Sequence, residues 1–416
     1  MGWTFPSRLG LLLLVRLAAV VLVEAAYINQ QEPLGVKEPA AVSSISVSLF
    51  ASLERLARLV DVSYCLGTTG IHKPFQCVSR CDEFPSVTLA STWSTGFLFG
   101  DSCGFIAVDH GSDQQRRNDE SVGDDEQGAI VVAFRGTYSI TNTIIDLSTM
   151  PQKYVPYPSP DHGGEPPEKP SHECTNCTVH SGFLDSWKSA RESVLPELKA
   201  LRAKYPSHPV HLIGHSLGGA VACLAALELK VSLGWDGVTV TTFGEPRVGN
   251  SQFAHFVDDV FDLDGIIDLE KRTYRRVTHA DDPVPLLPPG EFGYQSHSGE
   301  IFISKSALSP SETDVQLCIG DADPNCSARD DSSVENLLNR LLHFRLTTSS
   351  LEEYMERMSL PARFRLWQLF FAHRDYFWRL GLCVPGGDPT NWGRPPYAPH
   401  DEELQSRATI DERFNE

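Results

Sequence analysis

The stretch that decides the fold, residues 210–229, reads VHLIGHSLGGAVACLAALEL. Its first four residues predict a buried strand, and its Ala- and Leu-rich second half predicts a helix. Between them stands GHSLG, which matches the G-x-S-x-G pattern of a nucleophile elbow, where a sharp turn raises a serine hydroxyl above the sheet. The pattern indicates that Ser216 is a nucleophile; the alternative is a glycine-rich turn with an incidental serine.

Gly214 and Gly218 flank this serine. A serine in a strained backbone conformation brings strand and helix close together, so we expect a Cβ at either glycine to collide with its neighbours. The helix also begins without a conventional polar cap, which leaves its first N–H groups available to a developing oxyanion. The local sequence therefore suits acyl transfer.

A serine nucleophile needs a histidine to take its proton and a carboxylate to orient that histidine. After an elbow of this kind the acid precedes the base in the chain. The segment RRVTHADDPVPLLPP, residues 275–289, predicts a strand end followed by a proline-rich stop, where a carboxylate would be held in place. It offers Asp281 and Asp282, and spacing alone does not separate them.

Four histidines follow these aspartates: His297, His343, His373 and His400. We expect His400 to lie in a disordered tail and His343 to be a satisfied residue of a helix. His373 precedes an aromatic cluster and a cysteine that can attach its segment to the fold, and His297 remains a rival. His215 should point away from the hydroxyl at such a turn, so we interpret it as structural.

Strand and helix patterns alternate around the elbow. Continuous apolar runs predict strands at residues 129–134, 210–213 and 238–244. Amphipathic spacing predicts helices at residues 47–65, 182–206 and 219–233. This alternation implies an α/β fold with a mostly parallel, mixed central sheet flanked by helices. Residues 95–110 suggest paired strands, and residues 294–303 suggest a hairpin.

Net charge and the N-terminal sequence indicate which partners and which cellular compartment to expect. A formal charge of −19 over 416 residues argues against nucleic acid or an anionic bilayer as an electrostatic partner. Residues 1–26 begin with a segment that carries the basic residue Arg8, followed by an apolar run and small residues, the layout of a cleaved secretory signal peptide. Arg16 interrupts the run, and the alternative is an uncleaved membrane anchor. We expect a secreted protein.

Ten cysteines suit an exported chain. Several stand in close pairs, which we interpret as local disulfides rather than metal sites: Cys77 with Cys81, Cys174 with Cys177, and Cys318 with Cys326. Cys174 lies in a Pro-rich loop, whereas a redox Cys-x-x-Cys should open a helix after a strand. No metal or cofactor is expected.

The motifs taken together resemble the fungal class 3 lipases, the family of filamentous-fungal triacylglycerol lipases and feruloyl esterases. The matching segments, in the family's order, are AFRGTYSITNTIIDL, VHSGFLDSW, LIGHSLGGA, FGEPRVGN, RVTHADDPVPLLPP, EFGYQSHSGEIFI and HRDYFWRLGLC. The resemblance implies an α/β-hydrolase fold with a short helical lid. It also implies a catalytic triad of Ser216, Asp282 and His373, and it makes the motif around His297 non-catalytic.

The same resemblance assigns the oxyanion hole to Thr137 and to the backbone N–H of Leu217. It implies a disulfide between Cys65 and Cys383, and it leaves over Cys103 and Cys223. We interpret Cys223 as a buried small apolar residue.

The expected organisation is a signal peptide (1–26), a lipase domain (27–393) and a disordered tail (394–416). Within the domain we expect a lid at about 138–147, an irregular Pro-rich loop at 151–172 and a helical insertion at about 330–368. Thr143 stands where many relatives carry tryptophan, so we expect only modest activation at a lipid surface.

These features predict a monomeric, secreted triacylglycerol lipase that acts on ester lipids at an oil–water or membrane interface. The alternatives within the enzyme class are a feruloyl esterase and a phospholipase A1. The alternatives outside it are a membrane-tethered vacuolar lipase and an inactive lipid-binding protein with a hydrolase fold.

Overall fold

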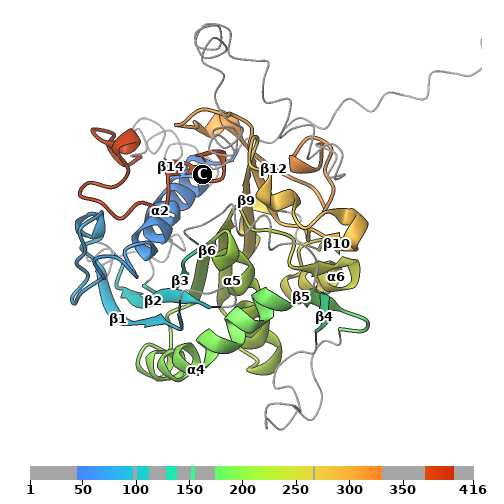
Figure 1. The fold of residues 1–416 in the computed structure, drawn as a ribbon, viewed down its shortest axis with the longest axis horizontal. Helices are drawn as coiled ribbons and strands as arrows, with labels where there is room; N and C mark the ends of the chain where they lie inside the picture. The colour runs from blue at the N-terminus through green and yellow to red at the C-terminus, as the bar shows by residue number, and fades with distance from the viewer. Residues whose placement is uncertain are drawn as a thin grey trace, which may run out of the picture. The chain divides into compact units, whose positions relative to one another are not determined.

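An eight-stranded mixed sheet forms the centre of the structure (Figure 1). The computed structural model describes residues 45–96, 101–111, 128–137, 151–154, 174–265, 268–329 and 371–397. All of these belong to one unit, Ser44–Glu416. The predicted signal peptide, the lid at 138–147 and the helical insertion at 330–368 lie outside the described residues.

The sheet is parallel in its middle and antiparallel at both edges. Its strands, in spatial order, are β1 (Val87–Ser94), β2 (Cys103–Asp109), β3 (Ala129–Phe134), β6 (Val210–His215), β7 (Val238–Phe243), β9 (Tyr274–His279), β11 (Glu300–Ile303) and β12 (Val315–Leu317). Strands β3, β6, β7, β9 and β11 pair in parallel, whereas β1, β2 and β12 run antiparallel to their neighbours. The predicted mostly parallel, mixed sheet is confirmed.

Helices cover both faces of this sheet (Figure 1). Helix α2 (Val47–Ser63) packs on one face, and α4 (Ser181–Lys204) and α5 (Leu217–Leu227) pack on the other. Strand β3 shows why both faces are apolar: Val132 packs with α4 and α5, and its neighbour Val131 packs with α2. Successive side chains of a strand point to opposite faces, so a strand that is buried on both sides needs a continuous apolar run.

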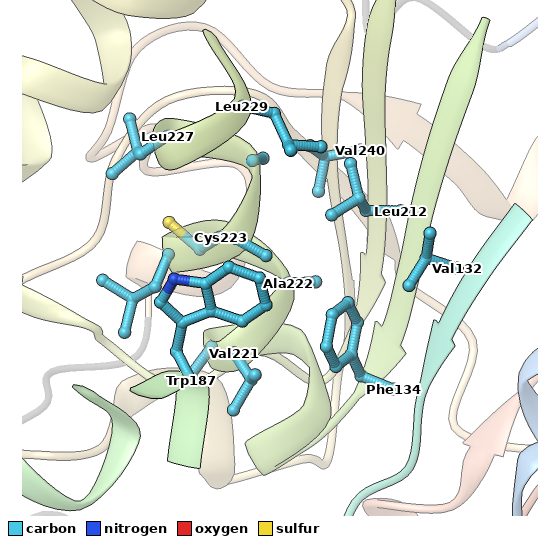
Figure 2. Close-up of a cluster of buried hydrophobic side chains, with 14 of the residues drawn as sticks. Val132, Phe134, Trp187, Leu212, Val221, Ala222, Cys223, Leu227, Leu229 and Val240 are labelled. Atoms are coloured by element: carbon cyan, nitrogen blue, oxygen red, sulfur yellow. The ribbon is translucent and has the colours of Figure 1, made fainter. Parts of the chain in front are cut away.

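Figure 2 shows part of the core on the α4 and α5 side. The Trp187 indole of α4 lies beside Phe134 of β3 and the Cys223 side chain of α5. The indole Nε1–H donates to Glu228 Oε2 at 2.9 Å, so its polar atom is satisfied inside the core. Cys223 is free and fully buried, and it packs in the apolar cluster on this side of the sheet, while its sulfur also lies near the polar atoms of Glu245 and His297.

Short elements complete the described structure. Helix α5 continues as a π turn, Glu228–Ser232, and α6 spans Ser251–Phe261. A second sheet has the order β10 (Tyr294–Gln295), β8 (Gly249–Asn250), β5 (Thr178–His180) and β4 (Pro151–Lys153). A third pairs β13 (Asp375–Tyr376) with β14 (Trp378–Arg379). Single 3-10 turns lie at Cys81–Glu83, Leu269–Lys271, Val284–Leu286, Gly290–Phe292, Glu312–Asp314, Ser327–Arg329 and Pro389–Asn391.

The hairpin predicted at 294–303 is wrong. Strand β10 pairs with β8 in the second sheet, whereas β11 pairs with β9 and β12 in the central one. The residues between them make buried polar contacts instead of a turn: the Ser298 N–H donates to Asp258 Oδ1 at 2.8 Å. All four residues of β11 are buried, which suits a strand inside the central sheet, between β9 and β12, better than one strand of an isolated hairpin.

Two further expectations need correction. The Pro-rich segment is not irregular throughout, because Pro151–Lys153 forms the edge strand β4 against β5. Proline is compatible with the first position of an edge strand, where no ladder N–H is needed. The tail does not become disordered at residue 394: the Arg394 guanidinium lies 4.3 Å from the Trp378 ring centroid, and the Tyr397 ring lies 4.8 Å from that of Phe50.

The predicted disulfides are present. Cys77–Cys81, Cys174–Cys177 and Cys318–Cys326 are bonded, Cys65 is bonded to Cys383, and Cys103 and Cys223 are free and buried. The Cys65–Cys383 bond ties α2 to the segment that carries His373, as the family resemblance implied.

Candidate active site

Ser216 occupies the turn between β6 and α5. Its backbone has φ 59° and ψ −131°. Residues other than glycine rarely adopt this backbone conformation, which costs about 1–3 kcal/mol. Its N–H donates to the Phe243 carbonyl of β7 at 2.9 Å, and its side chain makes no capping bond to α5. The hydroxyl is therefore held at the strand end without being used by the helix.

The flanking glycines are needed because a Cβ at either position would collide with neighbouring backbone, as the sequence suggested. A Cβ at Gly214 would lie 2.2 Å from the Gly218 carbonyl oxygen, and one at Gly218 would lie 2.3 Å from the Phe134 carbonyl oxygen. Gly136, which follows β3, is a third close approach: a Cβ there would lie 3.0 Å from the Ser216 Cβ. Sequence reasoning missed Gly136, although the motif AFRGT contains it.

Asp282 and His373 meet in the interior. His373 Nδ1 lies 2.8 Å from Asp282 Oδ2, and both side chains are fully buried. The other carboxylate oxygen, Oδ1, accepts the Val284 N–H at 2.9 Å, which fixes the aspartate in the turn after β9. Asp281 is partly exposed, and its N–H faces His279 at 3.5 Å. The structure thus brings the second aspartate to the histidine.

Three contacts keep Asp282 ionised. Burial raises the pKa of this carboxyl, but the charge and hydrogen bond of His373, with the donors of Tyr376 and Val284, hold the pKa below its ordinary value. Burial also raises the pKa of the Tyr376 phenol well above its usual range, so the phenol stays protonated and donates to Asp282 Oδ2. Tyr376 was missed by sequence reasoning, although its spacing from His373 in HRDY was visible.

Gly244 makes room for this pair. It has φ +60°, and a Cβ there would lie 2.8 Å from His373 Cε1 and 2.9 Å from Asp282 Oδ2. Its predecessor Phe243 accepts the Ser216 N–H, so the serine and the histidine border the same dipeptide. The motif FGEPRVGN carried this signal, which sequence reasoning did not use.

Two polar atoms at this place are buried and without a hydrogen-bond partner among the described residues, Ser216 Oγ and His373 Nε2. The first is a hydroxyl that can donate, and the second is a ring nitrogen that can accept once Nδ1 carries the proton shared with Asp282. A buried polar atom without a partner has a cost that a catalytic site can justify. Chemically, the arrangement can move a proton from a serine to a histidine.

Comparison with known proteins agrees with this chemistry. A sequence profile of the family described as Lipase (class 3) matches residues 131–292. A protein of Gibberella zeae named "Secreted mono- and diacylglycerol lipase 2" is 62% identical over 364 residues, covering 86% of this chain and 89% of that one. "Lipase A" of Sodiomyces alcalophilus is 61% identical over 372 residues, with the same two coverages.

The chain belongs to the class 3 lipase family. Among solved structures, the Lip2 lipase of Yarrowia lipolytica matches this lipase with a TM-score of 0.62 and 28% identity, covering 82% of this chain and 98% of that one. The Rhizomucor miehei lipase propeptide complex matches with a TM-score of 0.54 and 27% identity, covering 82% and 85%. These likenesses agree with the α/β-hydrolase architecture.

The two residues expected to supply the oxyanion donors are neighbours in sequence of Ser216 and of Gly136. Leu217 is buried and begins α5 directly after Ser216. Thr137 directly follows Gly136, whose backbone packs against the serine side chain. The tight approach of Gly136 therefore brings the residues after β3 close to Ser216.

His297 is not brought to the aspartates. Its Nδ1 lies 2.7 Å from the Ser298 carbonyl oxygen, and its Nε2 lies 3.3 Å from Glu245 Oε1. Glu245 Oε2 in turn accepts the hydroxyls of Thr242 at 2.6 Å and Tyr274 at 3.0 Å. This buried network uses both ring nitrogens. His343 and His400 lie outside the described residues.

The same network includes a possible set of metal donors, Cys223, Glu245 and His297, whose ligand atoms lie within 4.8 Å of one another. Burial raises the pKa of the Cys223 thiol well above its usual range, whereas metal binding needs a thiolate. With Glu245 already bonded to two hydroxyls, the set is better suited to hydrogen bonding in the core. Within the described ranges, no helix of the lipase is long and apolar enough to cross a membrane.

Proposed function

We propose that this chain is a secreted serine lipase that hydrolyses acylglycerols through Ser216, His373 and Asp282. One observation carries the proposal: His373 Nδ1 lies at hydrogen-bond distance from Asp282 Oδ2, while His373 Nε2 and the Ser216 hydroxyl are buried and have no partner within the part of the chain that the structure describes. The identity with named lipases over most of the chain supports the reaction class.

In the first half of the reaction, Ser216 Oγ attacks the ester carbonyl carbon and its proton passes to His373 Nε2. The cation on His373 is stabilised by the ionised Asp282. The N–H groups of Thr137 and Leu217 bind the tetrahedral oxyanion, and each such donor is worth about 10²–10³ in rate. The carbon–oxygen bond to the alcohol then breaks, and His373 returns the proton to the departing alcohol.

In the second half, water attacks the acyl-enzyme carbonyl while His373 takes a proton from it. The ester bond to Ser216 breaks, the serine recovers its proton and the fatty acid is released. This sequence needs no cofactor. The expected results are that Ser216→Ala abolishes hydrolysis and leaves the urea unfolding midpoint unchanged; a variant with near wild-type rate would refute the assignment.

For the substrate, we propose that partial acylglycerols are preferred over triacylglycerols, because the Gibberella zeae relative carries that activity in its name. Rates on monoolein, diolein and triolein in one emulsion test this preference. Higher activity on triolein would restore the triacylglycerol expectation, and higher activity on methyl ferulate or a phospholipid would favour the esterase or phospholipase A1 alternatives. Secretion as a monomer is tested by N-terminal sequencing and light scattering of protein from the culture medium.

A further inference from the structure

A buried chain of hydrogen bonds connects α2 to the backbone of the proposed base. The Tyr64 hydroxyl lies 2.6 Å from His215 Nδ1, and His215 Nε2 lies 2.7 Å from the carbonyl oxygen of His373. Tyr64 caps the C-terminus of α2, and all three residues are buried. Two elements far apart in sequence thus meet at the histidine through the residue before the nucleophile.

The direction of each bond follows from what each atom can do. A carbonyl oxygen only accepts, so His215 Nε2 must carry the proton and donate to His373. In a neutral imidazole the other nitrogen then accepts, and the Tyr64 hydroxyl is its donor. Burial, followed by the charge of His373, lowers the pKa of His215 to about 3, so its ring is neutral at working pH.

Neutrality matters because the two imidazoles face each other. The ring centroids of His215 and His373 are 4.5 Å apart, and the ring planes are inclined by 32°. His373 gains a proton during acyl transfer, and a charged neighbour at this separation would oppose that step. The bonds to Tyr64 and to the His373 carbonyl keep His215 uncharged and in one orientation.

Other contacts hold the same segment at positions downstream of the proposed base. Asp61 Oδ1 accepts the Gly381 N–H at 2.7 Å, and Cys65 is bonded to Cys383. Glu54 accepts the indole N–H of Trp378. These contacts attach the segment downstream of the histidine. The bond from His215 is made to the backbone carbonyl of His373. The position of that backbone determines how the His373 ring is oriented when its Nδ1 contacts Asp282.

We propose that His215, oriented by Tyr64, is a positioning residue that fixes the backbone of His373 so that Nε2 faces Ser216 while Nδ1 stays on Asp282. The proposal rests on the proposed role of His373 as the base. It changes the interpretation of His215 from a structural neighbour of the serine to a determinant of rate.

The test compares Tyr64→Phe and His215→Ala with the matched control Ser63→Ala on a soluble p-nitrophenyl ester. Ser63 is fully buried next to Tyr64, but its hydroxyl donates to the Val60 carbonyl of its own helix at 2.6 Å. A misplacement of about 1 Å can cost about 10²-fold in rate, so we expect kcat to fall about tenfold in Tyr64→Phe and about 100-fold in His215→Ala. KM should stay within about twofold, because binding is not altered.

Two further variants test the connection itself. His215→Gln places an amide N–H within reach of the same carbonyl and should recover most of the kcat lost in His215→Ala. Once His215 is absent, removing the Tyr64 hydroxyl should cost nothing more, so the double variant Tyr64→Phe/His215→Ala should equal His215→Ala alone. Multiplied losses would show that Tyr64 acts by another route and would overturn the proposal.

The outcome separates this inference from the proposed function. If Ser216→Ala or His373→Ala remains active, the proposed function fails. If both are inactive but Tyr64→Phe has the kcat of Ser63→Ala, the positioning role alone fails. A kcat loss in Tyr64→Phe that follows the unfolded fraction in a urea titration would also overturn it, because the effect would then be on stability alone.

Discussion

Replacing Asp61 by Asn should make the stability of the lipase less dependent on pH. Asp61 lies on α2, is 1% exposed, and accepts the Gly381 N–H through Oδ1, while Oδ2 has no partner among the described residues. Burial raises the pKa of its carboxyl to about 7, and the Gly381 hydrogen bond and the arginines nearby only partly oppose this.

The sign follows from proton binding. Between pH 3.8, the ordinary pKa of an exposed aspartate, and about pH 7, the unfolded chain releases this proton and the folded chain retains it. The contribution of Asp61 to stability is therefore fully present below pH 3.8 and is lost as the pH rises to about 7. The shift of about 3 pKa units corresponds to about 4 kcal/mol at about 1.4 kcal/mol per unit, an upper bound because the interior can relax.

Asparagine keeps the Oδ1 acceptor for the Gly381 N–H and cannot ionise. The variant should match the wild-type free energy of unfolding near pH 4 and exceed it by up to about 4 kcal/mol at pH 8. Urea titrations at pH 4, 6 and 8 measure this difference, with Asp82→Asn as the control because Asp82 is exposed. A difference between variant and wild type that is constant from pH 4 to pH 8 would refute the reasoning.

The remaining predictions concern activity. Tyr376→Phe removes a donor to Asp282 and should lower kcat about tenfold. The loss should grow toward acid pH, because losing this donor raises the Asp282 pKa; a parallel pH–rate profile would contradict this. Gly244→Ala should reduce kcat at least about 100-fold, since its Cβ would displace His373; unchanged kcat would show that the site has room. On an ester series crossing its solubility limit, activity should rise modestly, and equal rates for monomeric and emulsified substrate would count against a functioning lid.

The sequence predicted those features that depend on neighbours in the chain. The buried run at β3, the amphipathic α2 and the elbow all follow from local spacing, and the structure contains each of them. The strained φ of Ser216 and the collisions at Gly214 and Gly218 were expected because an elbow allows only one geometry.

Features set by tertiary contacts could not be obtained from spacing. Asp281 and Asp282 are adjacent and chemically alike. Asp282 is the one held in the interior, where it accepts the Val284 N–H. His297 and His373 both follow the aspartates, and only the docking of the C-terminal segment on α2 distinguishes them. The resemblance to a family supplied both choices. The resemblance did not correct the predicted hairpin at 294–303. Strand β11 pairs in parallel with β9, which precedes it by more than twenty residues, and local spacing does not reveal such a distant partner.

Other missed residues belong to the buried polar network. In the sequence, Tyr376 resembles an ordinary aromatic residue of the core. Its hydrogen bond to Asp282 becomes visible only in the folded structure. The role of His215 was hidden in the same way: the motif places it beside the serine, whereas its contacts reach α2 and the C-terminal segment.

The docking of the C-terminal segment on α2, closed by the Cys65–Cys383 disulfide, makes the last described part of the chain the part that completes the proposed site. The ribosome makes Ser216 and Asp282 well before His373, and the histidine reaches them only when the last described segment docks on the first helix. A nascent chain, or one truncated before residue 371, therefore carries the proposed nucleophile without its proposed base.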